Sequence, residues 1–302
     1  MRISNLLPEK ELKEITIIEE HEFDTLGLLE SQTDLRLISF LDSPKYIQKI
    51  PSNVSMLIIT KEILDNISQF NRNYGLVLSE NPRILFFQLH NSLKDNLEYK
   101  RPLFENYISS DAQISELAVI EDHNVIIESG AIVEPFAYIH ANSVIGKNSV
   151  IRSGAQIGGV GFEFKRIQNA ILPVNHYGGV KIGENVEIQN GSCVDRAIYP
   201  WDNTEIGDYS KIDNLVYIGH AAKVKQKVLI AAGAIIGGRT IIKENAWIGI
   251  GAILKNGLVI GTNSRANMGA VVTKNVNDGE SVTGNFAIPH RDFINALRKG
   301  VR

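Results

Sequence analysis

The chain has 302 residues, enough to bury a substantial core in one large or two modest domains. Its formal charge of -3 provides no basic field for nucleic acid, and its single cysteine, Cys193, excludes a disulfide framework and a cysteine-based zinc site. The first residues lack the apolar run of a signal peptide, and no apolar stretch approaches the ~20 residues that span a bilayer. We therefore expect a cytoplasmic protein without a transmembrane segment.

Residues 1–104 have the pattern of a small α/β domain. The segments DLRLISFL (34–41), VSMLIIT (54–60) and GLVLSE (75–80) are typical of strands. The segments SPKYIQKI (43–50) and NPRILFFQLHNSL (81–93) are predicted helices, because each opens with an N-cap residue followed by proline at the first helical position.

Residues 105–284 repeat with a period of six, which fits neither a helix nor an amphipathic strand. An aliphatic or small apolar residue recurs at Ile206, Ile212, Ile218, Val224, Ile230, Ile236, Ile242, Ile248, Leu254, Ile260, Ala266 and Val272, and earlier at Val133, Ile139, Ile145, Ile151, Ile157, Ile182, Ile188 and Val194. A hexad with one inward residue makes one side of a triangular coil, so three hexads, about 18 residues, make one turn. The fold class predicted is mainly β, with a left-handed parallel β-helix after the α/β domain.

Two segments, 158–181 and 195–205, interrupt or weaken the hexads, and loops extruded from a solenoid often build its binding face. The tail, 285–302, is predicted to be a short basic helix that closes the open end of the solenoid.

Three of the seven histidines lie in hexads, His123, His140 and His220, and they are too widely spread for a solenoid zinc site. We expect no metal. His220 is the third residue of its hexad, a position that is mostly polar and outward in other hexads, so one interpretation is a solvated surface histidine. Its small neighbours leave the imidazole uncrowded, which a catalytic residue would need.

One turn beyond His220 lies Gly238, whose N–H could stand beside the imidazole. A base with a neighbouring N–H donor is what acyl transfer requires, since the base deprotonates the nucleophile and the donor stabilises the oxyanion. The alternative is that Gly237 and Gly238 serve a tight corner with positive φ. Asp213, seven residues before His220, could orient the imidazole or could stabilise a turn.

Several segments resemble the UDP-3-O-(3-hydroxyacyl)glucosamine N-acyltransferase family of lipid A synthesis. They are ISFLDSPKY, GGVGFEF, GGVKIGENVEIQNGSCVDR and GDYSKIDNLVYIGHAAKV, in the family's order. The resemblance implies that His220 is the general base and that Gly238 supplies the oxyanion N–H. It also implies that Phe40 and Tyr46 sandwich uracil, with Ser43 where the family has an asparagine contact. From the residues alone, without this resemblance, we would interpret Phe40 as a core residue and Tyr46 as part of a helix.

The predicted reaction is transfer of an acyl group from a thioester, on acyl carrier protein or coenzyme A, to the amino group of a UDP-linked amino sugar. Phe162 and Phe164 would shape the acyl or pantetheine channel, or pack their loop onto the solenoid. No permanently bound cofactor is expected, and the resemblance implies a homotrimer.

Two alternatives remain. Gly257 stands where the family often has a second histidine, and the tail resembles the closing segment of enzymes that use coenzyme A. These departures favour a coenzyme-A-dependent N- or O-acyltransferase for O-antigen or another surface polysaccharide. A non-catalytic scaffold is the other alternative.

Overall fold

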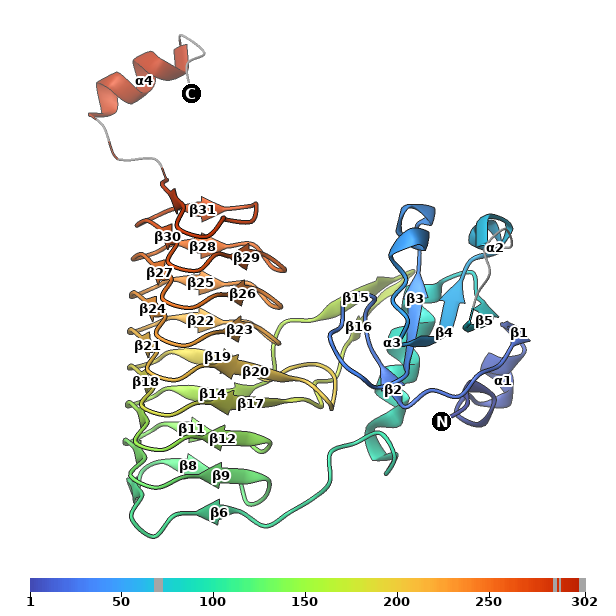
Figure 1. The fold of residues 1–302 in the computed structure, drawn as a ribbon, viewed down its shortest axis with the longest axis horizontal. Helices are drawn as coiled ribbons and strands as arrows, with labels where there is room; N and C mark the ends of the chain where they lie inside the picture. The colour runs from blue at the N-terminus through green and yellow to red at the C-terminus, as the bar shows by residue number, and fades with distance from the viewer. Residues whose placement is uncertain (68–72, 285–286, 288, 299–302) are drawn as a thin grey trace.

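The computed structural model describes residues 1–67, 73–284, 287 and 289–298. It consists of a small α/β domain beside a long solenoid, with one helix beyond the last coil (Figure 1). Within these ranges, no helix has the length and apolar character needed to cross a membrane.

The N-terminal domain is built on a five-stranded sheet in the order β1-β5-β4-β3-β2, in which β1 is antiparallel to its neighbour and the others are parallel. Its strands are β1 (Thr16–Glu19), β2 (Thr25–Leu26), β3 (Leu37–Leu41), β4 (Val54–Ile59) and β5 (Gly75–Leu78). Its helical segments are η1 (Ile3–Asn5), α1 (Glu9–Leu12), η2 (Pro44–Lys49), α2 (Lys61–Ile67), α3 (Pro82–Ser92) and η3 (Leu93–Asp95). The predicted strands fall on β3, β4 and β5, and the second predicted helix falls on α3.

The segment predicted as a helix at 43–50 is instead the short 3-10 helix η2. The cause lies in the next residues, because Ile50 precedes Pro51 and a residue before proline is pushed out of the helical region. Ile50 accordingly has extended backbone angles, φ -72° and ψ 115°. Ser43 starts this segment without a side-chain capping bond.

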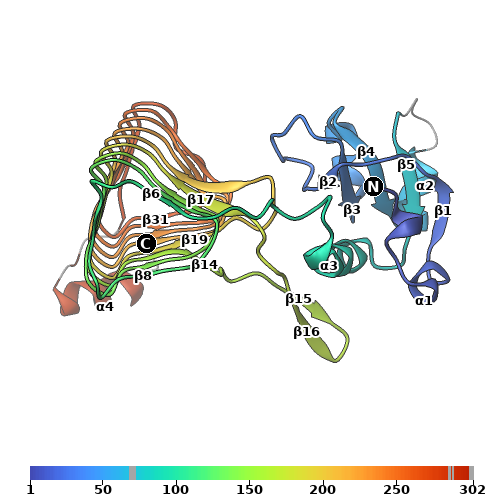
Figure 2. The same cartoon turned by 90° about the horizontal axis from the view of Figure 1, so that it is seen from below.

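The solenoid is a left-handed parallel β-helix with three sheets that form the sides of a triangle, seen end-on in Figure 2. The first sheet contains β7 (Gln113–Ile114), β10 (Ile132–Val133), β13 (Val150–Ile151), β18 (Glu187–Ile188), β21 (Lys211–Ile212), β24 (Leu229–Ile230), β27 (Trp247–Ile248), β30 (Arg265–Ala266) and β32 (Ser281–Val282). The second contains β8 (Val119–Ile120), β11 (Tyr138–Ile139), β14 (Gln156–Gly159), β19 (Cys193–Asp195), β22 (Tyr217–Ile218), β25 (Ile235–Ile236), β28 (Ile253–Leu254) and β31 (Val271–Val272). The third contains β6 (Tyr107–Ile108), β9 (Val125–Ile127), β12 (Ser143–Ile145), β17 (Gly179–Ile182), β20 (Asn203–Ile206), β23 (Lys223–Val224), β26 (Ile241–Ile242) and β29 (Val259–Ile260).

The residues that recur with a period of six form the core of this solenoid. Every residue predicted to point inward is buried in one continuous apolar cluster. Ile218 pairs with Ile236 in the neighbouring coil, which is the expected register of 18 residues per turn. The prediction of a β-helix is therefore confirmed.

The first interruption, 158–181, leaves the solenoid as the hairpin β15 (Phe164–Ile167) and β16 (Ala170–Pro173) and reaches toward α3 (Figures 1 and 2). The side chain of Asn91 on α3 donates to Pro173 O at 2.7 Å and accepts from Asn175 N at 3.0 Å. His90 Nε2 donates to Asn175 O at 2.8 Å. The second interruption also contacts the N-terminal domain, since Trp201 Nε1 donates to Leu26 O at 2.9 Å. Both interruptions thus hold the two parts of the chain together.

Helix α4 (His290–Arg298) lies beyond the last coil in Figure 1 and beside one corner of the triangle in Figure 2. The expectation that it closes the open end is wrong, because the helix stands away from the coil and Leu297 keeps 46% of its surface exposed. Part of the predicted tail segment, residues 285, 286, 288 and 299–302, lies outside the described residues.

Candidate active site

His220 lies at the corner that follows β22, on the side of the solenoid that faces the N-terminal domain. The corner turns at Ala221, which has a φ of 57°. His220 is only 6% exposed, so it is not the solvated surface residue that its hexad position suggested. The segment extruded after β14 covers His220, and the period of the repeat does not predict this covering.

Gly238 lies against the imidazole one coil further on. A Cβ atom on Gly238 would lie 2.7 Å from His220 Nε2 and 2.9 Å from Cε1, so only glycine allows this close approach. The left-handed position of this corner belongs to Arg239, with a φ of 60°, and neither Gly237 nor Gly238 has a positive φ. The interpretation that these two glycines supply a positive φ is therefore wrong. Within the described part of the chain, the Gly238 N–H has no hydrogen-bond partner.

The acidic neighbour of His220 is Glu163, from the extruded segment. Glu163 Oε2 lies 3.3 Å from His220 Nε2 and 3.8 Å from Arg239 Nη1, and Oε1 pairs with the Lys165 ammonium group. Burial alone would raise the pKa of Glu163, but the hydrogen bonds from His220 and Lys165 and the charges of Lys165 and Arg239 lower that pKa to about 2. Glu163 is thus held as a carboxylate beside the imidazole.

Asp213 does not contact His220. It follows β21, a strand of the first sheet, and so lies at a different corner from His220. Its carboxylate accepts hydrogen bonds from Asn214 N at 2.7 Å and from Ala232 N at 3.0 Å. This geometry matches the alternative of a turn-stabilising aspartate.

A second layer of buried polar groups lies behind His220. The rings of His176 and His220 meet edge to face, with centroids 5.7 Å apart. His176 Nδ1 donates to Val174 O at 3.0 Å, and burial lowers the pKa of His176 to about 4, which keeps it neutral. Burial also raises the pKa of Asp195, whose Oδ2 accepts a 2.6 Å hydrogen bond from Tyr217. Both His176 Nε2 and His220 Nδ1 are buried without a hydrogen-bond partner among the described residues.

Two pockets meet between the solenoid and the N-terminal domain. The larger, about 760 Å³, is lined by His220 and by Gly257, the position where a second histidine was considered. The smaller, about 460 Å³, is lined by Phe40 and Tyr46. Because both are lined by Leu28, Glu30 and Arg239, they form one continuous cleft.

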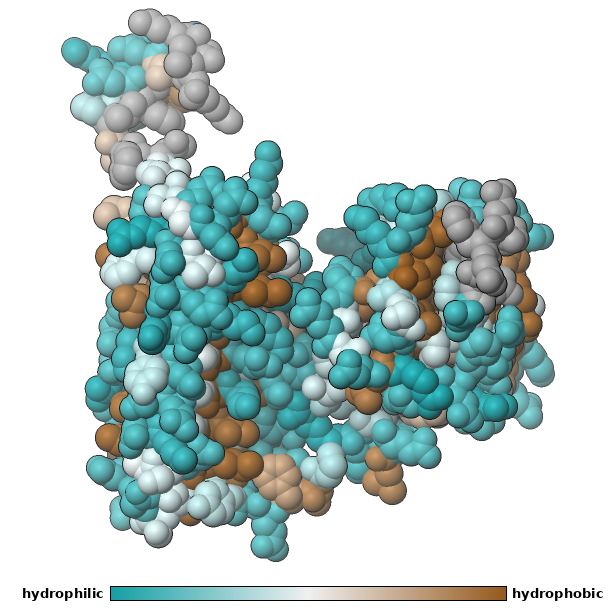
Figure 3. All heavy atoms as spheres, in the orientation of Figure 1, coloured by the Kyte–Doolittle hydropathy of each residue, from teal (hydrophilic) through white to brown (hydrophobic). Residues whose placement is uncertain are grey.

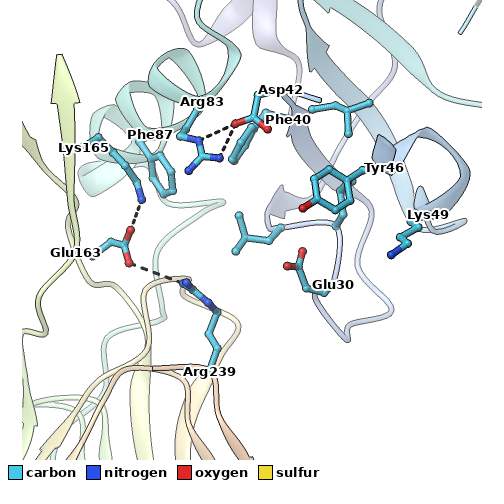
Figure 4. Close-up of a pocket in the computed structure, with 13 residues that line it drawn as sticks. Glu30, Phe40, Asp42, Tyr46, Lys49, Arg83, Phe87, Glu163, Lys165 and Arg239 are labelled. Carbon is cyan, nitrogen blue, oxygen red and sulfur yellow. Dashed lines mark hydrogen bonds and ion pairs between the residues drawn. The ribbon is translucent and has the colours of Figure 1, made fainter. Parts of the chain in front are cut away.

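The smaller pocket combines aromatic rings with cationic groups, as Figure 4 shows. Phe40 and Tyr46 come from the N-terminal domain, whereas Lys165 and Arg239 reach in from the solenoid side. Arg83 pairs with Asp42 at 2.5 Å and lies 5.3 Å from the centre of the Phe40 ring. The pocket also holds the carboxylates of Glu30, Asp42 and Glu163, so the anionic groups of a flat ligand would share these cations with them.

Three other predicted residues lie outside both pockets. Ser43 lies at the start of η2 and does not line the smaller pocket. Phe162 and Phe164 are 83% and 46% exposed, and their rings contact each other with centroids 4.8 Å apart. They flank Glu163 in sequence, and both aromatic side chains are exposed whereas the Glu163 side chain is buried beside His220.

Glu163, Lys165, Arg239 and His176 were not predicted as site residues. The signal for Glu163 and Lys165 in the sequence is the alternation of aromatic and charged residues in FEFK, inside a segment without hexads, and no such motif marks Arg239 or His176. Within residues 1–67, 73–284, 287 and 289–298, no group of three or more histidine, cysteine, aspartate or glutamate side chains is arranged to hold a metal ion.

The fold and the repeat define the architectural class of this chain, a left-handed β-helix built from hexapeptide repeats. Residues 124–159 match the bacterial transferase hexapeptide family (six repeats). A solved UDP-N-acetylglucosamine acyltransferase from Francisella novicida shares the fold, with a TM-score of 0.50 and 22% identity over 65% of this chain and 72% of that chain.

Two curated relatives are more similar in sequence over a shorter stretch. The chain is 47% identical over 64 residues to UDP-3-O-acylglucosamine N-acyltransferase 2 of Legionella pneumophila, and 41% identical over 64 residues to UDP-3-O-acylglucosamine N-acyltransferase of Delftia acidovorans. Each match covers 21% of this chain and 18% of the relative. The chain is thus similar to these enzymes in one segment that spans less than a fifth of their length.

Proposed function

We propose that this protein is an acyltransferase that moves an acyl group from a thioester to the amino group of a UDP-linked amino sugar. The observation that carries the proposal is the contact of Gly238 with His220, which lines a cleft that continues into a pocket with aromatic and cationic side chains. The names of the relatives support the same reaction, since both are N-acyltransferases of a UDP-linked glucosamine.

In this reaction His220 accepts a proton from the amine as its nitrogen attacks the thioester carbonyl. The C–N bond forms, the carbonyl oxygen becomes an oxyanion, and the Gly238 N–H donates to it. When the intermediate collapses, the C–S bond breaks and the proton held by His220 passes to the leaving thiolate. A positioned general base of this kind typically contributes ~10²–10⁴-fold to the rate.

The smaller pocket would bind the nucleotide end of the acceptor. Phe40 and Tyr46 offer the apolar surface on which a uracil ring stacks. Arg83, Lys165 and Arg239 offer charged donors for a diphosphate, and planar guanidinium groups bind phosphate oxygens in pairs. The sugar would then extend along the cleft toward His220.

The donor side and the biological setting belong to the same proposal. Phe162 and Phe164 form an exposed aromatic pair beside Glu163, which suits contact with an acyl chain or pantetheine arm. Acyl carrier protein or coenzyme A would carry the acyl group, with no permanent cofactor, in a cytoplasmic step of lipid A synthesis. The second candidate is a coenzyme-A-dependent enzyme for another surface polysaccharide. Gly257 favours it, since this residue lines the cleft without the histidine that the lipid A family often has there.

An acylation assay by mass spectrometry tests the proposal. It pairs acyl-carrier-protein and coenzyme A thioesters with a panel of UDP-amino sugars. We expect a product heavier by one acyl group with at least one pair, and the productive donor distinguishes the two candidates. No product from any pair would contradict the proposed reaction.

A further inference from the structure

The carboxylate of Glu163 occupies groups that the proposed reaction needs. Its Oε1 pairs with the Lys165 ammonium group, and its Oε2 lies 3.8 Å from Arg239 Nη1. Oε2 also lies 3.3 Å from His220 Nε2, which donates a hydrogen bond to it. Within the part of the chain that the structure describes, neither Lys165 nor Arg239 pairs with another carboxylate. One side chain therefore holds two cations of the smaller pocket and the imidazole at the same time.

We propose that Glu163 is an autoinhibitory residue whose carboxylate caps His220 until a diphosphate takes Lys165 and Arg239 from it. This role rests on the proposed function, which brings the diphosphate of the acceptor to these two cations. While Nε2–H donates to Glu163, Nε2 has no free lone pair and cannot take a proton from a substrate amine. Once the carboxylate has left, the imidazole is no longer held as the Nε2–H tautomer, and its edge beside Gly238 is free.

A diphosphate and Glu163 compete because they need the same cations. Glu163, Lys165 and Arg239 all line the smaller pocket, and Figure 4 shows the carboxylate between the two cations. The other guanidinium of this pocket, on Arg83, already pairs with Asp42. A diphosphate carries more negative charge than one carboxylate, and its oxygens accept paired hydrogen bonds from a guanidinium. If Glu163 stayed in place, like charges would lie side by side in a buried site, where repulsion is weakly screened.

The displacement needs only a rotation of the Glu163 side chain. Its backbone O accepts a 3.0 Å hydrogen bond from Val174 N across the base of the hairpin, so the backbone can stay in place. Burial raises the pKa of Glu163, but the hydrogen bonds from His220 and Lys165 and the charges of Lys165 and Arg239 lower it to about 2. The carboxylate therefore keeps its charge at neutral pH, and a competing anion, not protonation, must release it.

Calorimetry with UDP and uridine, without any acyl donor, tests the competition. The variant is Glu163→Gln, in which the amide keeps the shape of the side chain but has no charge to hold the two cations. We expect Glu163→Gln to bind UDP about tenfold more tightly than the wild type, because the diphosphate no longer displaces a carboxylate. Uridine, which has no phosphate, should bind both proteins equally.

Glu134→Gln is the control, because Glu134 pairs with Arg152 at 2.5 Å and lines neither pocket. It should bind UDP as the wild type does. An affinity of Glu163→Gln for UDP that is unchanged or weaker than that of the wild type would overturn the autoinhibitory role. Equal changes for UDP and uridine would also overturn it, since they would indicate a general change of the pocket.

Nuclear magnetic resonance of the wild type with isotope-labelled histidine tests the cap without a variant at Glu163. We expect the His220 Nε2–H to exchange slowly with solvent in the free protein and at least tenfold faster when inorganic pyrophosphate is bound, with His220→Ala identifying the signal. Exchange that pyrophosphate does not change would overturn the cap. Release by pyrophosphate, without acyl transfer from any thioester, would instead reject the proposed function and leave the cap intact.

Discussion

At the scale of single residues, the contact between Gly238 and His220 leaves no room for a methyl group. In Gly238→Ala the new Cβ would lie 2.7 Å from His220 Nε2, so the imidazole must move. A displacement of about 1 Å at a reacting group can cost about a hundredfold in rate. We therefore expect kcat to fall about a hundredfold while the KM for the nucleotide sugar changes little, as measured by initial rates.

Gly159→Ala provides the control for this substitution. Gly159 lies on β14 with an ordinary φ, and a Cβ there would approach only His140 Nε2, at 3.9 Å. This variant should keep the wild-type rate. If Gly238→Ala were as active as Gly159→Ala, the imidazole edge next to Gly238 would not be where the reaction occurs.

At the scale of elements, the extruded segment and α3 are joined through a buried neutral histidine. His90 is 0% exposed, its Nδ1 accepts from Tyr99 OH at 2.7 Å, and its Nε2 donates to Asn175 O. Burial lowers the pKa of His90 from 6.5 to about 4. At a pH between these two pKa values, His90 is protonated in the unfolded chain but neutral in the folded chain. The free energy of unfolding therefore falls as the pH falls from about 6.5 to about 4.

We expect this one histidine to account for about 2 kcal/mol of the stability lost between pH 7 and pH 5. In His90→Gln that loss should be smaller by about this amount, even though the variant is less stable at pH 7. Denaturant unfolding at the two pH values measures the difference. An unchanged dependence in His90→Gln would contradict the assignment.

The elements also show which parts of the structure could be predicted from the sequence. One buried aliphatic residue per hexad is a local rule repeated in every coil, so the period alone predicted the β-helix and its register. His220 and Gly238 could be brought together by the same rule, since 18 residues separate neighbouring coils.

Glu163 and the burial of His220 mark the limit of that rule. The extruded segment has no period, and its path depends on long-range contacts such as those of Asn91 with Pro173 and Asn175. No local spacing indicates that a carboxylate from this segment covers a histidine more than fifty residues away. The helix η2 is shorter than predicted for a local reason, the proline after Ile50.

At the scale of the whole molecule, the outer surface of the solenoid carries apolar side chains in a row. Ile235, Ile253 and Val271 follow one another on β25, β28 and β31 and are 42%, 40% and 66% exposed. Figure 3 shows hydrophobic atoms interrupting the hydrophilic surface of the solenoid. Exposed apolar patches of this kind are typical of protein–protein contacts, which agrees with the homotrimer that the sequence resemblance implies.

Light scattering in solution tests the oligomeric state. We expect the mass of a trimer for the wild type and of a monomer for Ile253→Glu, because a buried, unpaired carboxylate in the contact would be costly. Lys181→Glu, at an exposed position of the third sheet, should remain trimeric. A monomeric wild type would contradict the trimer, and a trimeric Ile253→Glu would place its contact on another face.

The whole molecule places His220 and the pocket of Phe40 and Tyr46 in one cleft, and His220→Ala tests the proposed role of His220 as the base most directly. The measurement is kcat/KM for acyl transfer to a UDP-amino sugar, with UDP binding measured in parallel and His123→Ala as the control. We expect kcat/KM to fall ~10²–10⁴-fold with UDP affinity unchanged, while His123→Ala keeps the wild-type rate. A His220→Ala protein that transfers the acyl group at the wild-type rate would contradict the account.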